Sequence, residues 1–162
     1  MQKMLSHGAV AEDNWTVLQQ PVETIPTGDI LVPMTYWLEH RTELSAQAGQ
    51  VGVWLDSDEE VEALVNDLGE LRLIALNFPK FVDGRSFSSA RLLRDRYDFQ
   101  GDIRAIGNVI QDQLYMLQRC GFTQFSLAPE VDLQEAAKSL SDFSDGYQTA
   151  ADQAQPLFKR LR

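Results

Sequence analysis

The sequence has few of the residues that commonly carry redox and metal chemistry. Cys120 is the single cysteine among 162 residues, which excludes an internal disulfide and any iron–sulfur cluster or zinc site built from cysteines. The two histidines, His7 and His40, fall in the N-terminal leader and on the first expected helix, which favours surface roles over metal binding or acid–base catalysis. Because Cys120 follows an expected helix, where the dipole disfavours a thiolate, we expect a packed thiol.

Long hydrophobic runs and common cofactor motifs are also missing. No apolar run approaches the roughly 20 residues of a membrane span, and residues 1–10 lack the apolar centre of a signal peptide. The chain has no glycine-rich phosphate loop, no dinucleotide fingerprint and no nucleophile elbow. We therefore expect a soluble, cytoplasmic protein that does not act at a membrane.

The charge is unevenly distributed along the chain. The net charge is −10, but residues 1–71 hold 13 acids and 2 bases, whereas residues 72–119 hold 5 acids and 8 bases. An acidic protein repels nucleic acid, and the basic middle lacks the interleaved aromatic residues that stack bases. The pattern excludes nucleic acid as a partner and favours an anionic small molecule or a charged protein.

Apolar periodicity predicts strands that alternate with helices. Strands are expected at residues 15–18, 51–55, 71–76, 103–106 and 122–127. Helices are expected from Pro33 towards Gly49, after a capping box of Ser57 and Glu60, from Ser88 with a Phe87–Leu92 staple, after an Asn108 cap, and after Asp132 with Glu135. The fold class is α/β: one domain with a mostly parallel sheet of four to five strands, open or a barrel-like fragment.

Three parts are expected along the chain. Residues 1–28 form a polar leader with a short strand and a linker, residues 29–146 form the core, and residues 147–162 form a weakly structured tail. Open parallel sheets bind ligands at the carboxyl ends of their strands, and the loop from Asn77 to Arg85 is the richest in polar residues there.

That loop has two interpretations. As an anion pocket, it would combine basic side chains with the backbone amides of the following helix. As a simple turn, Asp83-Gly84 would only reverse the chain, and Arg85 would pair with Asp83 or Asp112. The candidate anion-binding residues are Lys80, Asp83, Arg85, Ser88, Asn108 and Asp112.

Other side chains also allow two interpretations. Arg91, Arg94 and Arg96 form either a solvated helix face with an Arg91–Asp95 pair or a docking patch for a partner. The three tryptophans, Trp15, Trp37 and Trp54, are expected in the core rather than in a ligand cage. The carboxylates Asp56 and Asp58 suit a helix start better than a magnesium site, and no metal site is predicted.

Several motifs together resemble one bacterial family. The runs DGRSFSSARLLRDRY, GDIRAIGNVIQDQL and RCGF, with VPMTYWL, VGVWL, LIALNFPKF and DFSDGYQ, look like domain of unknown function 934. The motif positions in this chain are Asp83, Gly84, Arg85, Ser88, Ala90, Arg91, Leu93, Arg94, Arg104, Gly107, Asp112, Arg119, Cys120, Gly121 and Phe122. Phe87 stands where tyrosine is common, and Asn108 where aspartate is common.

The resemblance implies a role in sulfur assimilation, because members are encoded beside the haemoprotein of assimilatory sulfite reductase and are often labelled as oxidoreductases. No catalytic residues come with it, and a loosely bound flavin stays open as a cofactor. We expect an accessory protein that supports the sulfite reductase haemoprotein by docking, assembly or electron delivery, with Arg91, Arg94 and Arg104 at the docking surface. The alternatives are a small enzyme or sensor that binds a sulfur oxyanion, and a structural homo-oligomer.

Overall fold

The chain folds around one sheet of eight strands, more than the four to five predicted. The computed structural model describes residues 2–79 and 84–141. The strands are β1 (Lys3–Ser6), β2 (Ala9–Glu12), β3 (Thr16–Val17), β4 (Ile30–Pro33), β5 (Val51–Leu55), β6 (Leu73–Phe78), β7 (Asp102–Gly107) and β8 (Gln124–Phe125). The five predicted strands correspond to β3, β5, β6, β7 and β8.

The strand order is β2-β1-β8-β7-β6-β5-β4-β3. Strands β3 to β8 pair in parallel, as the alternation with helices predicted, whereas the β1–β2 hairpin joins β8 antiparallel. The two strands of this hairpin were not predicted, because their residues are short and of mixed polarity. Strand β4 was also missed: Pro33 ends this strand and caps the next helix instead of lying in its first turn.

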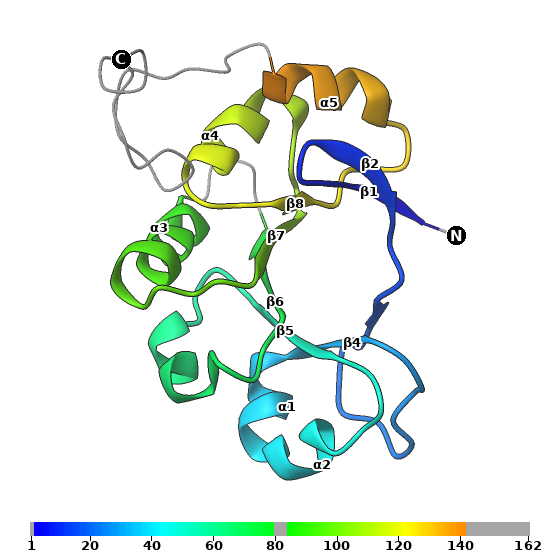
Figure 1. Cartoon of the computed structure of the whole chain (residues 1–162), viewed down its shortest axis with the longest axis vertical. Helices are drawn as coiled ribbons and strands as arrows, with labels where there is room; N and C mark the ends of the chain where they lie inside the picture. Colours follow the sequence, from blue (N-terminus) through cyan, green and yellow to red (C-terminus); the bar gives the residue numbers. More distant parts are fainter. Residues whose placement is uncertain (1, 80–83, 142–162) are drawn as a thin grey trace.

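Short helices follow most of the parallel strands and lie on the outer side of the curved sheet (Figure 1). The α-helices are α1 (Met34–Glu39), α2 (Arg41–Ser45), α3 (Arg85–Arg91), α4 (Leu114–Arg119) and α5 (Leu133–Ser141). Other helical elements complete them: the 3-10 helices η1 (Val61–Asp67) and η3 (Gln111–Gln113), and the π-helix η2 (Leu92–Arg96) that extends α3. Within the described residues, each helix is too short to cross a lipid bilayer.

Two helix starts differ from the predicted ones. Glu60 precedes η1 without a side-chain cap, and Glu59 instead accepts a hydrogen bond from the backbone of Asp56 at 2.7 Å. Helix α3 begins three residues before Ser88, so Phe87 lies inside it and stacks edge-to-face on Phe78. The capping prediction is confirmed at α5, where the Asp132 carboxylate accepts hydrogen bonds from the amides of residues 134 and 135.

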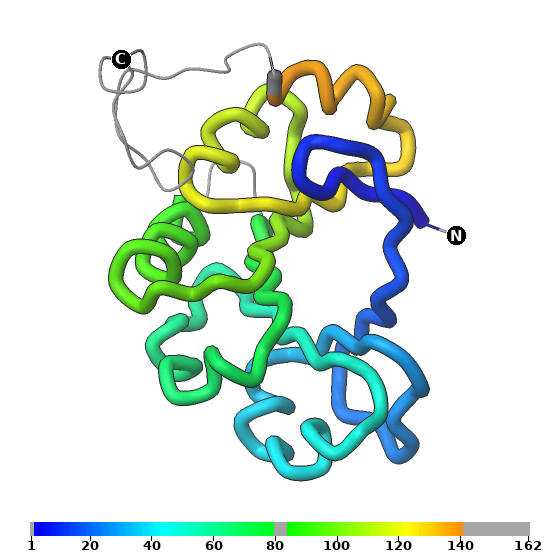
Figure 2. Tube along the Cα trace, in the orientation of Figure 1, coloured from blue at the N-terminus to red at the C-terminus, as the bar shows by residue number. Residues whose placement is uncertain are grey.

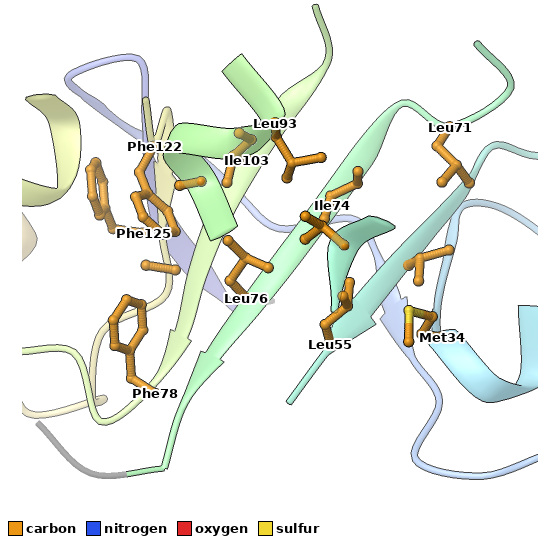
Figure 3. Close-up of a cluster of buried hydrophobic side chains, with 14 of the residues drawn as sticks. Met34, Leu55, Leu71, Ile74, Leu76, Phe78, Leu93, Ile103, Phe122 and Phe125 are labelled. Atoms are coloured by element: carbon orange, nitrogen blue, oxygen red, sulfur yellow. The ribbon is translucent and has the colours of Figure 1, made fainter. Parts of the chain in front are cut away.

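The main core lies between the sheet and the helices (Figure 3). Alternate residues of the central strands, including Ile74, Leu76 and Ile103, point to this face and are buried. Trp37 and Cys120 belong to the same core or pack against it, as expected. The positions between them, such as Ala75 and Arg104, therefore face the other, concave side of the sheet.

The sheet curls into a half-barrel, and the segment between β2 and β3 runs across its open side (Figure 2). We call residues 13–15 the strap. A small apolar cluster of Leu31, Leu73 and Ala75 lies on the concave face, with Trp15 of the strap and Trp54 packed against it. The strap therefore links the hairpin end of the sheet to its β3 end and covers part of the concave face.

The hairpin belongs to the folded core rather than to a leader, and this can be measured. Leu5 on β1 is 0% exposed within the main core. Leu5→Ala should lower the free energy of unfolding by about 3 kcal/mol, because it removes buried methyl groups and leaves a cavity. The measurement is urea denaturation followed by circular dichroism.

The matched control is Met116→Ala, since Met116 is 57% exposed on α4. That change should alter the free energy of unfolding by less than about 0.5 kcal/mol. If the two substitutions had equal effects, the hairpin would not be part of the cooperative core.

Candidate functional site

The predicted anion-binding residues do not form a basic pocket in the described part of the chain. Arg85 Nη2 donates a hydrogen bond to Ser57 Oγ at 3.0 Å. The depression beside Arg85 and Ser88 is lined by four acids: Asp58, Glu59, Glu60 and Glu62. This surrounding charge opposes an anion there, and Lys80 and Asp83 lie outside the described residues.

Asn108 and Asp112 lie elsewhere on the same rim of the sheet. The Asn108 side chain donates a hydrogen bond to the carbonyl of Pro79 and so ties the end of β7 to the end of β6. Asp112 is exposed in η3. Asn108 does not cap the following helix, which begins at Gln111 after Ile110.

The three arginines proposed for partner docking have very different environments. Arg91 is partly exposed and pairs with Asp95 at 2.7 Å, which confirms the predicted i to i+4 pair. Arg94 donates four hydrogen bonds to backbone carbonyls, at 2.7 to 3.1 Å, that belong to Phe99, Gly101 and Gly121. Arg94 therefore clamps two loops together and is committed to the fold.

Arg104 is the most unusual side chain of the structure. It lies in the middle of β7 and is only 1% exposed, so the prediction that it lies at a docking surface is wrong. Its Nη1 donates to both carboxylate oxygens of Asp13 on the strap, at 3.1 and 3.3 Å, and its Nε donates to Gln124 Oε1 at 3.0 Å. Among the described residues, the buried Nη2 has no hydrogen-bond partner.

The sheet register explains how a guanidinium fits here. Arg104 is flanked by Ala75 on β6 and by Gln124 on β8. Ala75 is small and fully buried, and Trp54 on β5 is its neighbour on the other side. The side-chain amide of Gln124 and the carboxylate of Asp13 hold the arginine on the concave face.

A polar network extends from Arg104 to the hairpin turn. Gln124 Nε2 donates to Asp102 Oδ2 at 3.1 Å, Thr123 Oγ1 donates to Asp102 Oδ1 at 2.9 Å, and His7 Nε2 lies 2.8 Å from the same oxygen. The network joins β1, β7, β8 and the strap. It thus fixes the position of Arg104 from both ends.

Burial lowers the pKa of Arg104, and the carboxylates of Asp13 and Asp102 act against that shift. Burial likewise lowers the pKa of Arg94, against a smaller opposing effect of Asp102. The nearby carboxylates therefore offset part of the cost of removing each guanidinium from water.

Arg104 lines a pocket of about 520 Å³ on the concave face of the half-barrel. The other lining residues are Gln2, Asp13, Val17, Gln19, Leu31, Trp54, Asp56, Asn77, Ile106, Gly107 and Ser126. They come from the strap, from β3 to β7 and from the carboxyl ends of β5, β6 and β7. The pocket thus occupies the place where open parallel sheets bind ligands.

Gly107 shapes the floor of this pocket at the end of β7. Its φ is +87°, a left-handed conformation that a glycine adopts without strain. A Cβ atom here would collide with Asn77 Oδ1 and with the carbonyl of Phe78. The absence of a side chain lets Asn77 approach the end of β7, where its Nδ2 donates to Asp56 Oδ1 at 3.0 Å.

Sequence reasoning assigned Arg104 to the wrong environment. One signal was available: Arg104 stands between Ile103 and Ala105 in a strand whose alternate residues are apolar, so it had to face the opposite side of the sheet. That this side is covered depends on Asp13, which lies 91 residues away in the sequence. No local pattern reports a contact of that range.

One of three comparisons with known proteins gives a match. A protein-family model described as "Bacterial protein of unknown function (DUF934)" matches residues 52–158. The chain belongs to this family. No curated protein and no solved structure matches the chain. The DUF934 match begins at β5, so it includes Arg104 but not Asp13 of the strap.

The Arg104–Asp13 pair predicts a large effect of removing one charge. Asp13 is 8% exposed, so Asp13→Asn leaves the buried guanidinium without its nearest counter-charge. The free energy of unfolding should fall by about 3 kcal/mol. Asp58→Asn, at an exposed acid, is the control, and an equal loss of stability in both variants would contradict a special role of the pair.

The clamp formed by Arg94 gives a second prediction for the arginines. Arg94→Ala should lower the free energy of unfolding by about 3 kcal/mol, because three carbonyls lose a charged donor. Arg91→Ala should cost less than about 1 kcal/mol, because its ion pair is exposed. Thermal unfolding of both variants tests this, and a more damaging Arg91→Ala would refute it.

Proposed function

We propose that this DUF934 protein binds a small molecule with an anionic group in the concave pocket. The observation that carries the proposal is the buried Arg104 Nη2, which has no hydrogen-bond partner among the described residues and belongs to a residue that lines the pocket. Nη2 is also shielded from solvent, so an acceptor reaches it through a small movement of the pocket wall.

The energetics favour occupation of this site. A buried donor without a partner costs about 1–3 kcal/mol, and more when it is charged. An anionic acceptor that reaches Nη2 would recover this energy by a charge-assisted hydrogen bond. Because Gln124 and Asp13 already hold Nε and Nη1, the guanidinium itself is in position before a ligand binds.

This proposal retains one of the alternatives drawn from the sequence, a small-molecule site at the carboxyl edge of the sheet, but moves it from Arg85 to Arg104. The acids around Arg85 disfavour an anion at the earlier position. The pocket on the concave face offers a cation that is buried, positioned and incompletely bonded. Those three properties are what a specific anion site requires.

An accessory role beside the sulfite reductase haemoprotein is a separate proposal that comes from the family resemblance. It requires a docking surface, and of the three arginines proposed for it only Arg91 lies at the surface. Arg94 and Arg104 are committed to internal contacts. The geometry therefore supports ligand binding more strongly than docking through these residues.

The structural-oligomer alternative has less support. Within the described residues, the large apolar side chains that are clearly exposed are Val17, Val65, Ile110 and Met116. They lie on different elements, and none of them belongs to α1 or α5. Single exposed apolar residues are normal on a protein surface.

The test is a calorimetric titration of the full chain with sulfite, sulfate, phosphate, acetate and benzoate. We expect saturable binding of at least one of these anions, and a loss of about tenfold or more in affinity for Arg104→Lys, because lysine lacks the planar fork. Arg85→Ala is the matched control and should bind like the parent chain.

A second variant covers the case in which Arg104→Lys does not fold. Ser126→Phe leaves residue 104 unchanged, adds bulk to the pocket wall and should weaken the same binding. If Arg85→Ala abolishes binding while Ser126→Phe preserves it, the site is at the loop before α3 and the proposal is wrong. Flat titrations with all five anions would also refute it.

A further inference from the structure

We infer that the ligand of the concave pocket is a monocarboxylate with a flat or branched apolar body, and not a tetrahedral oxyanion such as sulfate or phosphate. This inference rests on the proposed function, because it specifies the ligand class of the same site. Its support comes from three properties of the pocket: its net charge, its supply of donors and its apolar wall.

The pocket wall has a net negative charge. Arg104 is its one basic side chain among the described residues, whereas Asp13 and Asp56 are both acidic. Asp13 neutralises Arg104 directly, and Asp56 has no basic partner in the part of the chain that the structure describes. Each added negative charge on a ligand is repelled by this wall, so a monoanion is favoured over a dianion.

The pocket offers few charged hydrogen-bond donors. Arg104 uses Nε and Nη1 within the protein, and Asn77 uses its Nδ2 on Asp56. Trp54 uses its single donor, Nε1, on the carbonyl of Leu18 at 2.9 Å. Among the described residues of the wall, Nη2 is therefore the one charged nitrogen left without a partner, and the hydroxyl of Ser126 and the amides of Gln2 and Gln19 are neutral donors. This supply suits a carboxylate monoanion better than a sulfate dianion.

One part of the wall is apolar. Because the Nε1 of Trp54 is occupied, its indole offers only ring surface to a ligand, and Leu31 and Ile106 line the pocket beside it. In the sheet register Ala75 on β6 lies between Trp54 on β5 and Arg104 on β7, and both Trp54 and Arg104 line the pocket. A ligand with its carboxylate at Arg104 would therefore place its apolar body against Trp54.

The experiment compares matched acids, amides and inorganic anions by calorimetry on the full chain. The acids are benzoate, phenylacetate and 4-methylpentanoate, each with its primary amide, and the inorganic anions are sulfate, sulfite and phosphate. At least one acid should bind about tenfold more tightly than its amide and than any inorganic anion. Trp54→Leu should weaken that acid about tenfold, whereas Trp54→Phe, which keeps a ring but loses the hydrogen bond, should retain most of the affinity.

The outcomes separate this inference from the proposed function. If sulfate, sulfite or phosphate binds as tightly as the best acid, and Arg104→Lys abolishes that binding, the ligand class is wrong and the anion site stands. If amides bind as tightly as acids, or no anion binds at all, both are wrong. If Trp54→Leu and Trp54→Phe lose affinity equally while both remain folded by circular dichroism, the ring surface has no part in recognition and the inference fails.

Discussion

The charged contact between Arg104 and Asp13 is the constraint on which the concave side of the protein depends. A guanidinium in the middle of a parallel strand is costly to bury, and the strap supplies the carboxylate that offsets this cost. The contact draws the strap across the open side of the half-barrel. Without it, the curled sheet would present an arginine and an apolar cluster on an uncovered face.

The contact with Asp13 leaves one nitrogen of the Arg104 guanidinium available to a ligand. Two of the three guanidinium nitrogens are bonded within the protein, and the third, Nη2, has no partner in the part of the chain that the structure describes. Native structures rarely leave a buried charged donor unsatisfied, and such exceptions often mark functional sites. The fold therefore combines a rigid support for Arg104 with one free hydrogen-bonding position that a ligand can use.

Arg94 shows a different use of a charged side chain. It is partly buried, and its hydrogen bonds go to backbone carbonyls of the loops around Phe99 and Gly121. A satisfied arginine of this kind stabilises chain crossings and offers little to a ligand. The contrast between Arg94 and Arg104 distinguishes a structural cation from a candidate binding group by its hydrogen bonds alone.

The sequence by itself determined the α/β class, the parallel strands β5 to β8 and the Asp132 cap of α5, because apolar periodicity and capping are local properties. The tertiary structure decided the rest. The hairpin joins the sheet through its contact with β8, and the site forms where Asp13 meets Arg104, 91 residues further along the chain. Arg91, Arg94 and Arg104 look alike in the local pattern of charge. Contacts with residues far away in the sequence decide which of them is exposed, which joins two loops and which is buried.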